Sequence, residues 1–226
     1  MATSYASSVL NYCVEEDIEN FLLLDIDSSF STQVQTWIAS AEKWINNYCG
    51  YTTASGFLRE SISNEIVPGR VDADLNLVVF PRKIPLVSVS ALALIKGTSS
   101  VTLSLTSGSS NRYNIPTTAD YIYYPEAELS ISGASIISSF AEMKGQRFFC
   151  QTSYIAGYNP LPADVHLATV NIVADYVMRH ANKEGLQSIT QGRVSKTWYQ
   201  RKGGESDFVQ DAKILLAPYR MGAHWA

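Results

Sequence analysis

The spacing of apolar residues indicates two helices in the first fifty positions. In residues 31–50 apolar side chains recur at intervals of three and four, the period of one helix face. The face consists of Val34, Trp37, Ile38, Ala41, Trp44, Ile45 and Tyr48. Ser31 is suited to cap the start of this helix, and Gly50 to end it in a left-handed conformation. A first, shorter helix is predicted from Val14 to Leu24, because its acidic first turn suits the positive end of a helix dipole.

From Phe57 to about Tyr158 the period changes to two, which is typical of β-strands. Turn signals at Pro68-Gly69, Gly97 and Gly133 separate the alternating segments. These segments read LNLVVF, VSVSALALI, VTLSLT, YIYY, LSISG and RFFCQTSYIAGY. The pattern predicts an all-β block that is large enough for a small sandwich or barrel.

Helical spacing returns at Pro162, a residue favoured at a first helical position. The helix that follows is apolar almost all round, which indicates a central core helix or an oligomer contact. Residues 185–204 are basic and contain several glycines, and we expect an extended loop or hairpin there. Asp207 is expected to cap a last helix, Phe208 to Leu216, that Pro218 stops.

These elements predict an α+β fold. A small domain of about four helices would consist of residues 1–56 and 151–226. An all-β domain, residues 57–150, would be inserted into it as a sandwich or barrel-like body.

Composition narrows the class of protein. The net charge of -4 argues against a general nucleic-acid binder, which normally carries a basic excess. The N-terminus lacks the basic and apolar regions of a secretory signal, and no stretch has the roughly 18 apolar residues of a membrane span. The three cysteines are widely spaced, so we expect buried thiols rather than disulfides or a zinc site.

Charge is unevenly distributed along the chain. Residues 1–50 hold seven acidic residues against one base, and residues 183–202 hold five bases against one acid. The acidic residues include Glu15, Glu16 and Glu19, and the bases include Arg193, Lys196, Arg201 and Lys202. The two segments are candidates for contact across a subunit boundary, with two separate solvated faces as the alternative.

A search of the sequence for chemistry predicts no catalytic residue, no metal and no cofactor. The motifs of serine hydrolases, zinc proteases, dinucleotide sites and phosphate loops are absent. Two segments that begin like calcium loops lack the required glycine and glutamate. We interpret His166, His180 and His224 as structural, and Glu126 and Glu128 as a solvated pair on one strand.

Several segments, taken in order, resemble the head–tail connector, or adaptor, family of tailed bacteriophages. They are YCVEEDIENFL, WIASAEKWINNYCGY, YIAGYNPLPADVHLATV, GLQSITQGRVSKTWY and LLAPYRMG. The resemblance covers residues 11–58 and 150–222, and the order of the set is more specific than any one motif. The long β segment departs from the pattern of compact helical members, which leaves its role open.

The resemblance implies a structural virion protein of the neck, made in the host cytoplasm. Such subunits form a ring, commonly dodecameric, between the portal protein and a stopper, head-closure or tail protein. Double-stranded DNA passes through the ring without specific binding, and no membrane is involved. A closed ring requires a heterologous contact between neighbouring copies.

The resemblance also implies roles for particular residues. Portal contact is expected at the C-terminal end, at Leu216, Pro218, Tyr219, Arg220, His224 and Trp225. The four basic residues named above would face either a neighbouring subunit's acidic helix or the lumen. The junction formed by Gly157, Tyr158, Pro160 and Pro162 would be architectural and set the angle between strand and helix. Two alternatives remain: a carbohydrate- or receptor-binding β module of a virion, and a cell-wall hydrolase that uses Glu126 or Glu128.

Overall fold

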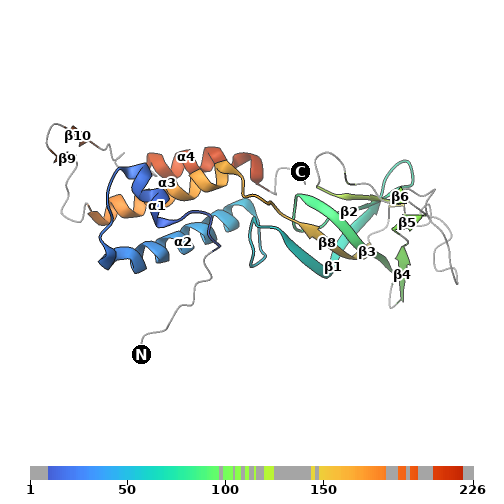
Figure 1. Cartoon of the computed structure of the whole chain (residues 1–226). Coiled ribbons are helices and arrows are strands. Elements are labelled where there is room, and N and C mark those ends of the chain that lie inside the picture. Colours follow the sequence, from blue (N-terminus) through green and yellow to red (C-terminus); the bar gives the residue numbers. More distant parts are fainter. Residues whose placement is uncertain are drawn as a thin grey trace, which may run out of the picture. The chain divides into compact units, whose positions relative to one another are not determined.

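The computed structural model confirms a mixed α+β protein whose chain divides into two compact units (Figure 1). The first unit comprises residues 1–56 and 160–226, and the second comprises residues 57–159. The structure describes residues 10–96, 99–103, 105–107, 110–111, 115, 120–124, 144–145, 148–181, 188–191, 194–197 and 206–220. The second unit includes the whole of strand β8, so the chain returns to the helical unit only at Pro160.

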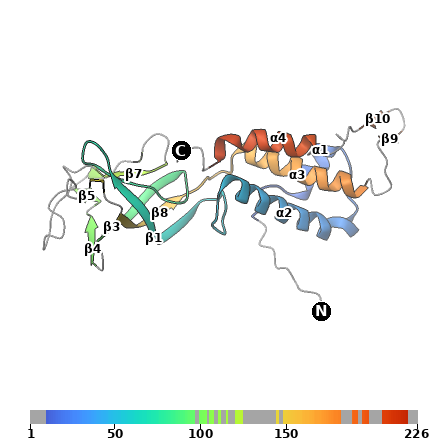
Figure 2. The same ribbon diagram turned by 180° about the vertical axis from the view of Figure 1, so that it is seen from behind.

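Four α-helices form the described part of the first unit. They are α1 (Glu15–Leu22), α2 (Ser31–Cys49), α3 (Ala163–Ala181) and α4 (Asp207–Leu216), with 3-10 turns at η1 (Ser28–Phe30) and η4 (Ala217–Tyr219). Helix α3 packs against the other three, and Figures 1 and 2 both show it between α2 and α4. This central position explains why the sequence of α3 has so little polar face.

Helix α2 buries most of the stripe that its sequence predicts, but Tyr48, like the two tryptophans, is only half-buried. Val34, Ile38, Ala41 and Ile45 are buried, whereas Trp37 and Trp44 are only half-buried. Full burial of an isoleucine side chain stabilises by about 1.5–3 kcal/mol, so Ile38 and Ile45 are main contributors. Gly50 ends the helix with φ 89°, as expected. Ser31 is not the cap: its hydroxyl donates to Glu15 Oε1 instead, at 2.8 Å.

Helices α1 and α4 begin differently from what their sequences predict. In α1, Asp17 Oδ2 accepts from the N–H of Val14 at 2.8 Å, and the helix ends at Leu22 because Leu23 is left-handed, with φ 54°. In α4, the cap is Ser206 rather than Asp207, and the Ser206 hydroxyl accepts from the N–H of Val209 at 3.3 Å. In the segment for which a loop or hairpin is expected, β9 (Ser188–Gln191) pairs antiparallel with β10 (Val194–Thr197).

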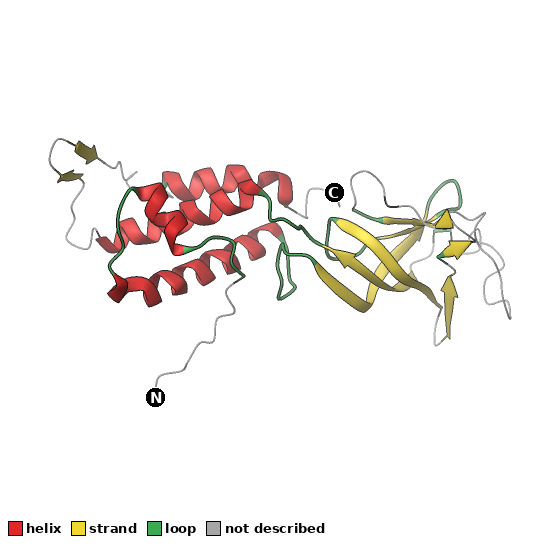
Figure 3. Ribbon diagram, in the orientation of Figure 1, coloured by secondary structure: helices red, strands yellow, loops and turns green. Residues whose placement is uncertain are grey.

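The second unit is built on a six-stranded antiparallel sheet that curls into a half-barrel (Figure 3). The strand order is β4-β3-β8-β1-β2-β7. The strands are β1 (Glu60–Val71), β2 (Leu77–Val79), β3 (Leu86–Lys96), β4 (Ser99–Leu103), β7 (Ile122–Tyr124) and β8 (Phe148–Ala156), and β5 (Thr106–Ser107) pairs with β6 (Ser110–Asn111). The concave face holds one apolar cluster that includes Val67, Leu92, Leu94, Ile122 and Cys150, all but completely buried.

Strand β1 contains the residues that the sequence marked as a turn. Pro68 pairs with Phe149 and Gly69 pairs with Phe148, so this turn signal is wrong. The carbonyl of Pro68 accepts from the N–H of Phe80 at 3.4 Å, on the side where β2 has already ended. Proline has no N–H to donate, but no β2 residue lies opposite this position, so the β1–β2 pairing loses no hydrogen bond. A Cβ at Gly69 would lie 2.5 Å from the Phe148 ring, so glycine allows this close contact.

All three cysteines, Cys13, Cys49 and Cys150, are free and buried, as predicted. Burial raises the pKa of each thiol to about 12. The described residues contain no helix that is both long enough and apolar enough to cross a membrane.

Candidate functional site

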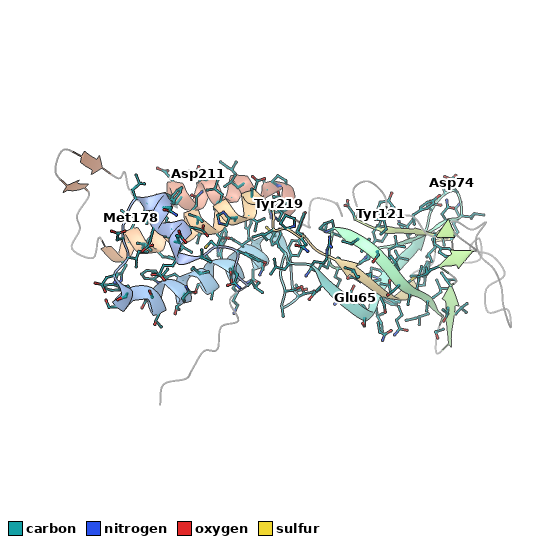
Figure 4. All side chains as sticks on the ribbon, viewed as in Figure 1. Glu65, Asp74, Tyr121, Met178, Asp211 and Tyr219 are labelled. Carbon is teal, nitrogen blue, oxygen red and sulfur yellow. The ribbon has the colours of Figure 1, made fainter. Side chains whose placement is uncertain are left out.

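The end of α4 carries the described part of the C-terminal region that the sequence singles out. Figure 4 labels Tyr219 at this end of the helical unit and Met178, on α3, at the opposite end. Leu216 is completely buried, so its side chain supports the bundle and the predicted portal contact at this residue is withdrawn. Tyr219 is half-buried and its hydroxyl donates to Asp164 Oδ2 at 3.2 Å, which ties η4 to the first turn of α3. His224 and Trp225 lie outside the described residues.

Several residues near this end are half-buried or exposed, and we call them together the tail surface. Its members are Trp44, Tyr48, Ile214, Pro218 and Arg220. The Trp44 and Tyr48 rings stack with 5.1 Å between centroids and 5° between planes, and the Arg220 guanidinium lies 4.9 Å from the Tyr48 centroid. Ile214 is 67% exposed, and Pro218, four residues further on, is exposed too. Trp, Tyr and Arg side chains are the most frequent anchors of protein interfaces.

The predicted acidic contact residues of α1 are used mostly within the helical unit. Glu15 accepts from the Ser31 hydroxyl, and Glu19 Oε1 accepts from the N–H of Ile26 at 2.8 Å. Both carboxylates therefore fix the connection from α1 to α2. Glu16 is exposed and remains the candidate for an outside partner.

The basic candidates fall largely outside the part of the chain that the structure describes. Arg193, Arg201 and Lys202 are not among the described residues, and neither are Glu126 and Glu128. Lys196 lies on β10, where its backbone pairs with Ile189. Its side chain is not described, so contact with a neighbour or with DNA stays a prediction.

The junction residues are divided between the two units. Within the β unit, Gly157 has φ 102°, and a Cβ there would lie 2.6 Å from the carbonyl oxygen of Leu58. Tyr158 N–H donates to Phe57 O at 2.8 Å, and Arg59 N–H donates to Tyr158 O at 3.0 Å. These bonds hold the start and the end of the β unit side by side.

The prolines of the junction lie in the helical unit. Pro160 is exposed, and Pro162 immediately precedes α3. The carbonyl of Pro162 accepts from the N–H groups of Val165 and His166, both at 3.1 Å. Pro162 thus helps to start the helix from the position before it, not from inside it.

A network of buried polar groups, which periodicity did not reveal, attaches the N-terminal segment to α2. Glu42 is 2% exposed and accepts from the N–H of Leu10 at 2.7 Å and of Tyr12 at 2.9 Å. The buried Tyr12 hydroxyl donates to Asn46 Oδ1 at 2.8 Å. A Cβ at Gly56 would lie 2.2 Å from this hydroxyl. Burial raises the pKa of Glu42, and the backbone N–H donors oppose that shift.

Two of the histidines have structural partners. His166 Nε2 lies 3.1 Å from Asp17 Oδ2, which joins α3 to α1. Burial alone would raise the pKa of Asp17, but the Val14 N–H and His166 outweigh burial and lower it. The His180 ring makes edge contacts with Phe30 at 5.4 Å and Trp37 at 5.3 Å. The His180 ring therefore packs among aromatic side chains of η1 and α2.

The β unit contains a second polar network, formed by two glutamates of β1. Lys83, whose side chain is 1% exposed, lies with Nζ 3.0 Å from Glu60 Oε1. The Tyr154 hydroxyl donates to Glu65 Oε2 at 2.6 Å. A register shift between Ile62 and Glu65 lets residues five positions apart reach the same region. Burial lowers the pKa of Lys83, with Glu60 opposing the shift, and raises that of Tyr154, with Glu65 adding to the effect.

The described residues do not bring together a group of three or more His, Cys, Asp or Glu side chains that could hold a metal ion. Lys83 lies in the β2–β3 connection and is almost completely buried, so its contact with Glu60 holds this connection against β1.

Comparison with protein-family models finds no match for this sequence. Comparison with curated proteins likewise finds no relative at the significance that we required.

Proposed function

We propose that the chain is a structural subunit of the head–tail connector of a tailed bacteriophage. In this proposal it forms a dodecameric ring below the portal, joins the head to a stopper or tail protein, and lets double-stranded DNA pass. The protein would be made in the host cytoplasm and reside in the virion neck, without enzymatic activity or a cofactor. The support comes from the ordered sequence segments that resemble this family.

The helical unit supports the proposal because it unites most of those segments, although residues 57–58 and 150–159 belong to the β unit. Residues 11–58 and 150–222 carry the resemblance, and they supply α1, α2, α3 and α4, which pack together around α3. The observation that carries the proposal is the tail surface at the end of α4, with Ile214 67% exposed. We assign this surface, in its described part, to the portal contact.

A docking experiment tests this assignment with a matched pair of variants. Ile214→Ser alters the tail surface, and Ile66→Ser alters an isoleucine that is 53% exposed on the β unit. We expect Ile214→Ser to weaken binding to purified portal by about tenfold or more, and Ile66→Ser to leave it unchanged. Equal binding by both variants would move the portal contact elsewhere on the chain.

Electron microscopy of virions, with the protein located by a specific label, tests the function as a whole. A ring of density between portal and tail is the expected result. Label at the tail tip or on the capsid surface would refute the connector proposal.

We propose further that the β unit is an inserted, barrel-like domain with a contact role of its own. The observation that favours this role is the convex face of the sheet. Pairing places Pro68, Phe149 and Ile95 in one row across β1, β8 and β3, and Ile66, Gln151 and Ala93 in the next. Phe149 is 55% exposed, and none of the six carries a charge. Cores of interfaces are depleted of charge in the same way.

This face would meet another neck or tail component, or, in the alternative of a carbohydrate- or receptor-binding module, a host surface molecule. A Phe149→Ser variant distinguishes the two. Loss of attachment of assembled particles to cells favours the receptor role, whereas loss of tail joining favours the neck role.

A further inference from the structure

We propose that residues 10–22 form a detachable module that two copies of this chain can exchange. The module comprises the segment Leu10–Val14 together with α1, and its receiving site is formed by α2, Gly56 and α3. In the exchanged form, the module of one copy would occupy the receiving site of a second copy. This inference concerns the helical unit alone, and it does not require the connector function to be correct.

The receiving site holds the module by directional bonds as well as by apolar packing of Tyr12, Ile18 and Leu22, which are buried. Glu42 accepts two backbone N–H groups of the module, and Asn46 accepts the hydroxyl of Tyr12. Asp17 of α1 reaches His166 of α3 at 3.1 Å. These bonds specify one segment in one register, so a second copy of the same segment is the occupant that the site fits.

The connection between the module and α2 has the properties of a hinge. Leu23 has φ 54°, a conformation that costs energy for any residue with a Cβ, and its side chain is 77% exposed. Strain in a short connecting segment favours exchange between copies, because the extended form releases it.

Two hydrogen bonds from the connection to Glu19 of α1 hold Leu23 in this conformation. The N–H of Leu24 donates to Glu19 O at 3.1 Å, and the N–H of Ile26 donates to Glu19 Oε1. The five residues 23–27, fully extended, span at most about 17 Å. The second copy's receiving site must therefore lie close by, as it does for adjacent subunits of a compact assembly.

Thiol labelling of the full-length, unmodified chain tests whether the module opens. Cys13 lies in the module, whereas Cys49 lies on α2 and Cys150 on β8, and all three are buried with similarly raised pKa values. We expect Cys13 to be labelled about 100-fold faster than the other two, since only local opening exposes it. If Cys13 is labelled no faster than Cys49 and Cys150, the module does not detach and the proposal is overturned.

Mixing two defective full-length chains tests exchange itself. Tyr12→Ala damages the module, and Glu42→Ala damages the receiving site. An exchanged pair of the two variants contains one module and site that are both intact, so we expect a mixed dimer by size-exclusion chromatography with light scattering. Tagged and untagged Tyr12→Ala chains form the control, because their pairs contain no intact module.

The same readout applied to tagged and untagged wild-type chains, mixed in urea at a concentration where Cys13 opens, covers the case in which a variant does not fold. Leu23→Gly removes the hinge strain and should lower the exchanged fraction by about tenfold. Labelling of Cys13 without any mixed dimer, in variants and wild type alike, would also overturn the proposal.

Discussion

The substitution Gly157→Ala should strongly destabilise the β unit, because the added Cβ would introduce both backbone strain and a steric conflict. Gly157 has φ 102°, and a residue with a Cβ adopts this conformation only at a cost of about 1–3 kcal/mol. That Cβ would also lie 2.6 Å from Leu58 O and 2.8 Å from Leu58 C, so the backbone must separate there. The Tyr158–Phe57 and Arg59–Tyr158 hydrogen bonds are the ones at risk, at about 1 kcal/mol each. Together these terms predict a loss of about 3–5 kcal/mol.

Gly145→Ala is the matched control. Gly145 also has a positive φ, 78°, but an added Cβ there meets nothing within 4 Å. This variant should lose only the conformational cost, about 1 kcal/mol. The difference between the two variants therefore isolates the steric conflict with Leu58.

The assay must report on the β unit. Tryptophan fluorescence does not, because the four tryptophans, at positions 37, 44, 198 and 225, all belong to the helical unit. Hydrogen exchange of the β8 amides at increasing urea concentrations reports on the sheet. Tryptophan fluorescence reports on the helices. We expect the Gly157→Ala midpoint for the sheet to fall by about 2 M. A loss no larger than that of Gly145→Ala would refute the assignment of a tight strand crossing at this junction.

Three further predictions concern buried charge and buried thiols. Glu60→Ala should destabilise the β unit by about 3–5 kcal/mol, measured by urea unfolding, because it leaves the Lys83 ammonium buried and less well paired. Lys83→Met should cost clearly less, and the opposite order would contradict this reading. The Asp17 pKa lies below its usual 3.8, so the stability that this carboxylate provides is present above that value and is lost as pH falls through the lowered pKa. Asp17→Asn should therefore flatten the acid limb of a stability–pH curve, and an unchanged limb would count against the Asp17–His166 contact. Cys49 and Cys150 should resist a thiol reagent in the native chain and react fully in denaturant, and rapid native labelling of Cys150 would contradict its place in the sheet core.

Periodicity predicted the helices better than the sheet because helical packing is encoded over short distances. Twenty consecutive residues were enough to predict the apolar stripe of α2 and the glycine that ends the helix. The buried Glu42 and Asn46 were not, since a polar residue normally marks the outer face and their partners lie some thirty positions away. Pro68 and Gly69 resemble a turn in the sequence, yet both lie within β1. The strand accepts Pro68 because β2 ends beside it, and it accepts Gly69 because the Phe148 ring leaves no room for a Cβ. Neither neighbour can be identified from the local sequence.

The sequence also predicted the exposure of some candidate contact residues and not of others. Pro218, Tyr219 and Arg220 lie at the end of α4, where the sequence predicted an exposed tail, and Pro218 and Arg220 are exposed. Leu216 follows the helical period into the core, so proximity to the tail was a poor guide to its exposure. Trp44 and Tyr48 belong to the apolar face predicted for α2, but both are half-buried, and Arg220 covers the Tyr48 ring from far along the chain. Local periodicity does not reveal such a distant contact.

The adjacency of Phe57 and Tyr158 makes the β unit modular for protein engineering. Its entry and exit are held together by hydrogen bonds within the unit itself, so the helical unit needs to bridge only a short gap if the unit is removed. A chain in which a few glycines replace residues 57–159 should keep α1 to α4, and another domain with neighbouring ends should be accepted at the same place. The position between Gly56 and Pro160 is thus a natural cassette site, at which new binding functions could be displayed on a constant helical base.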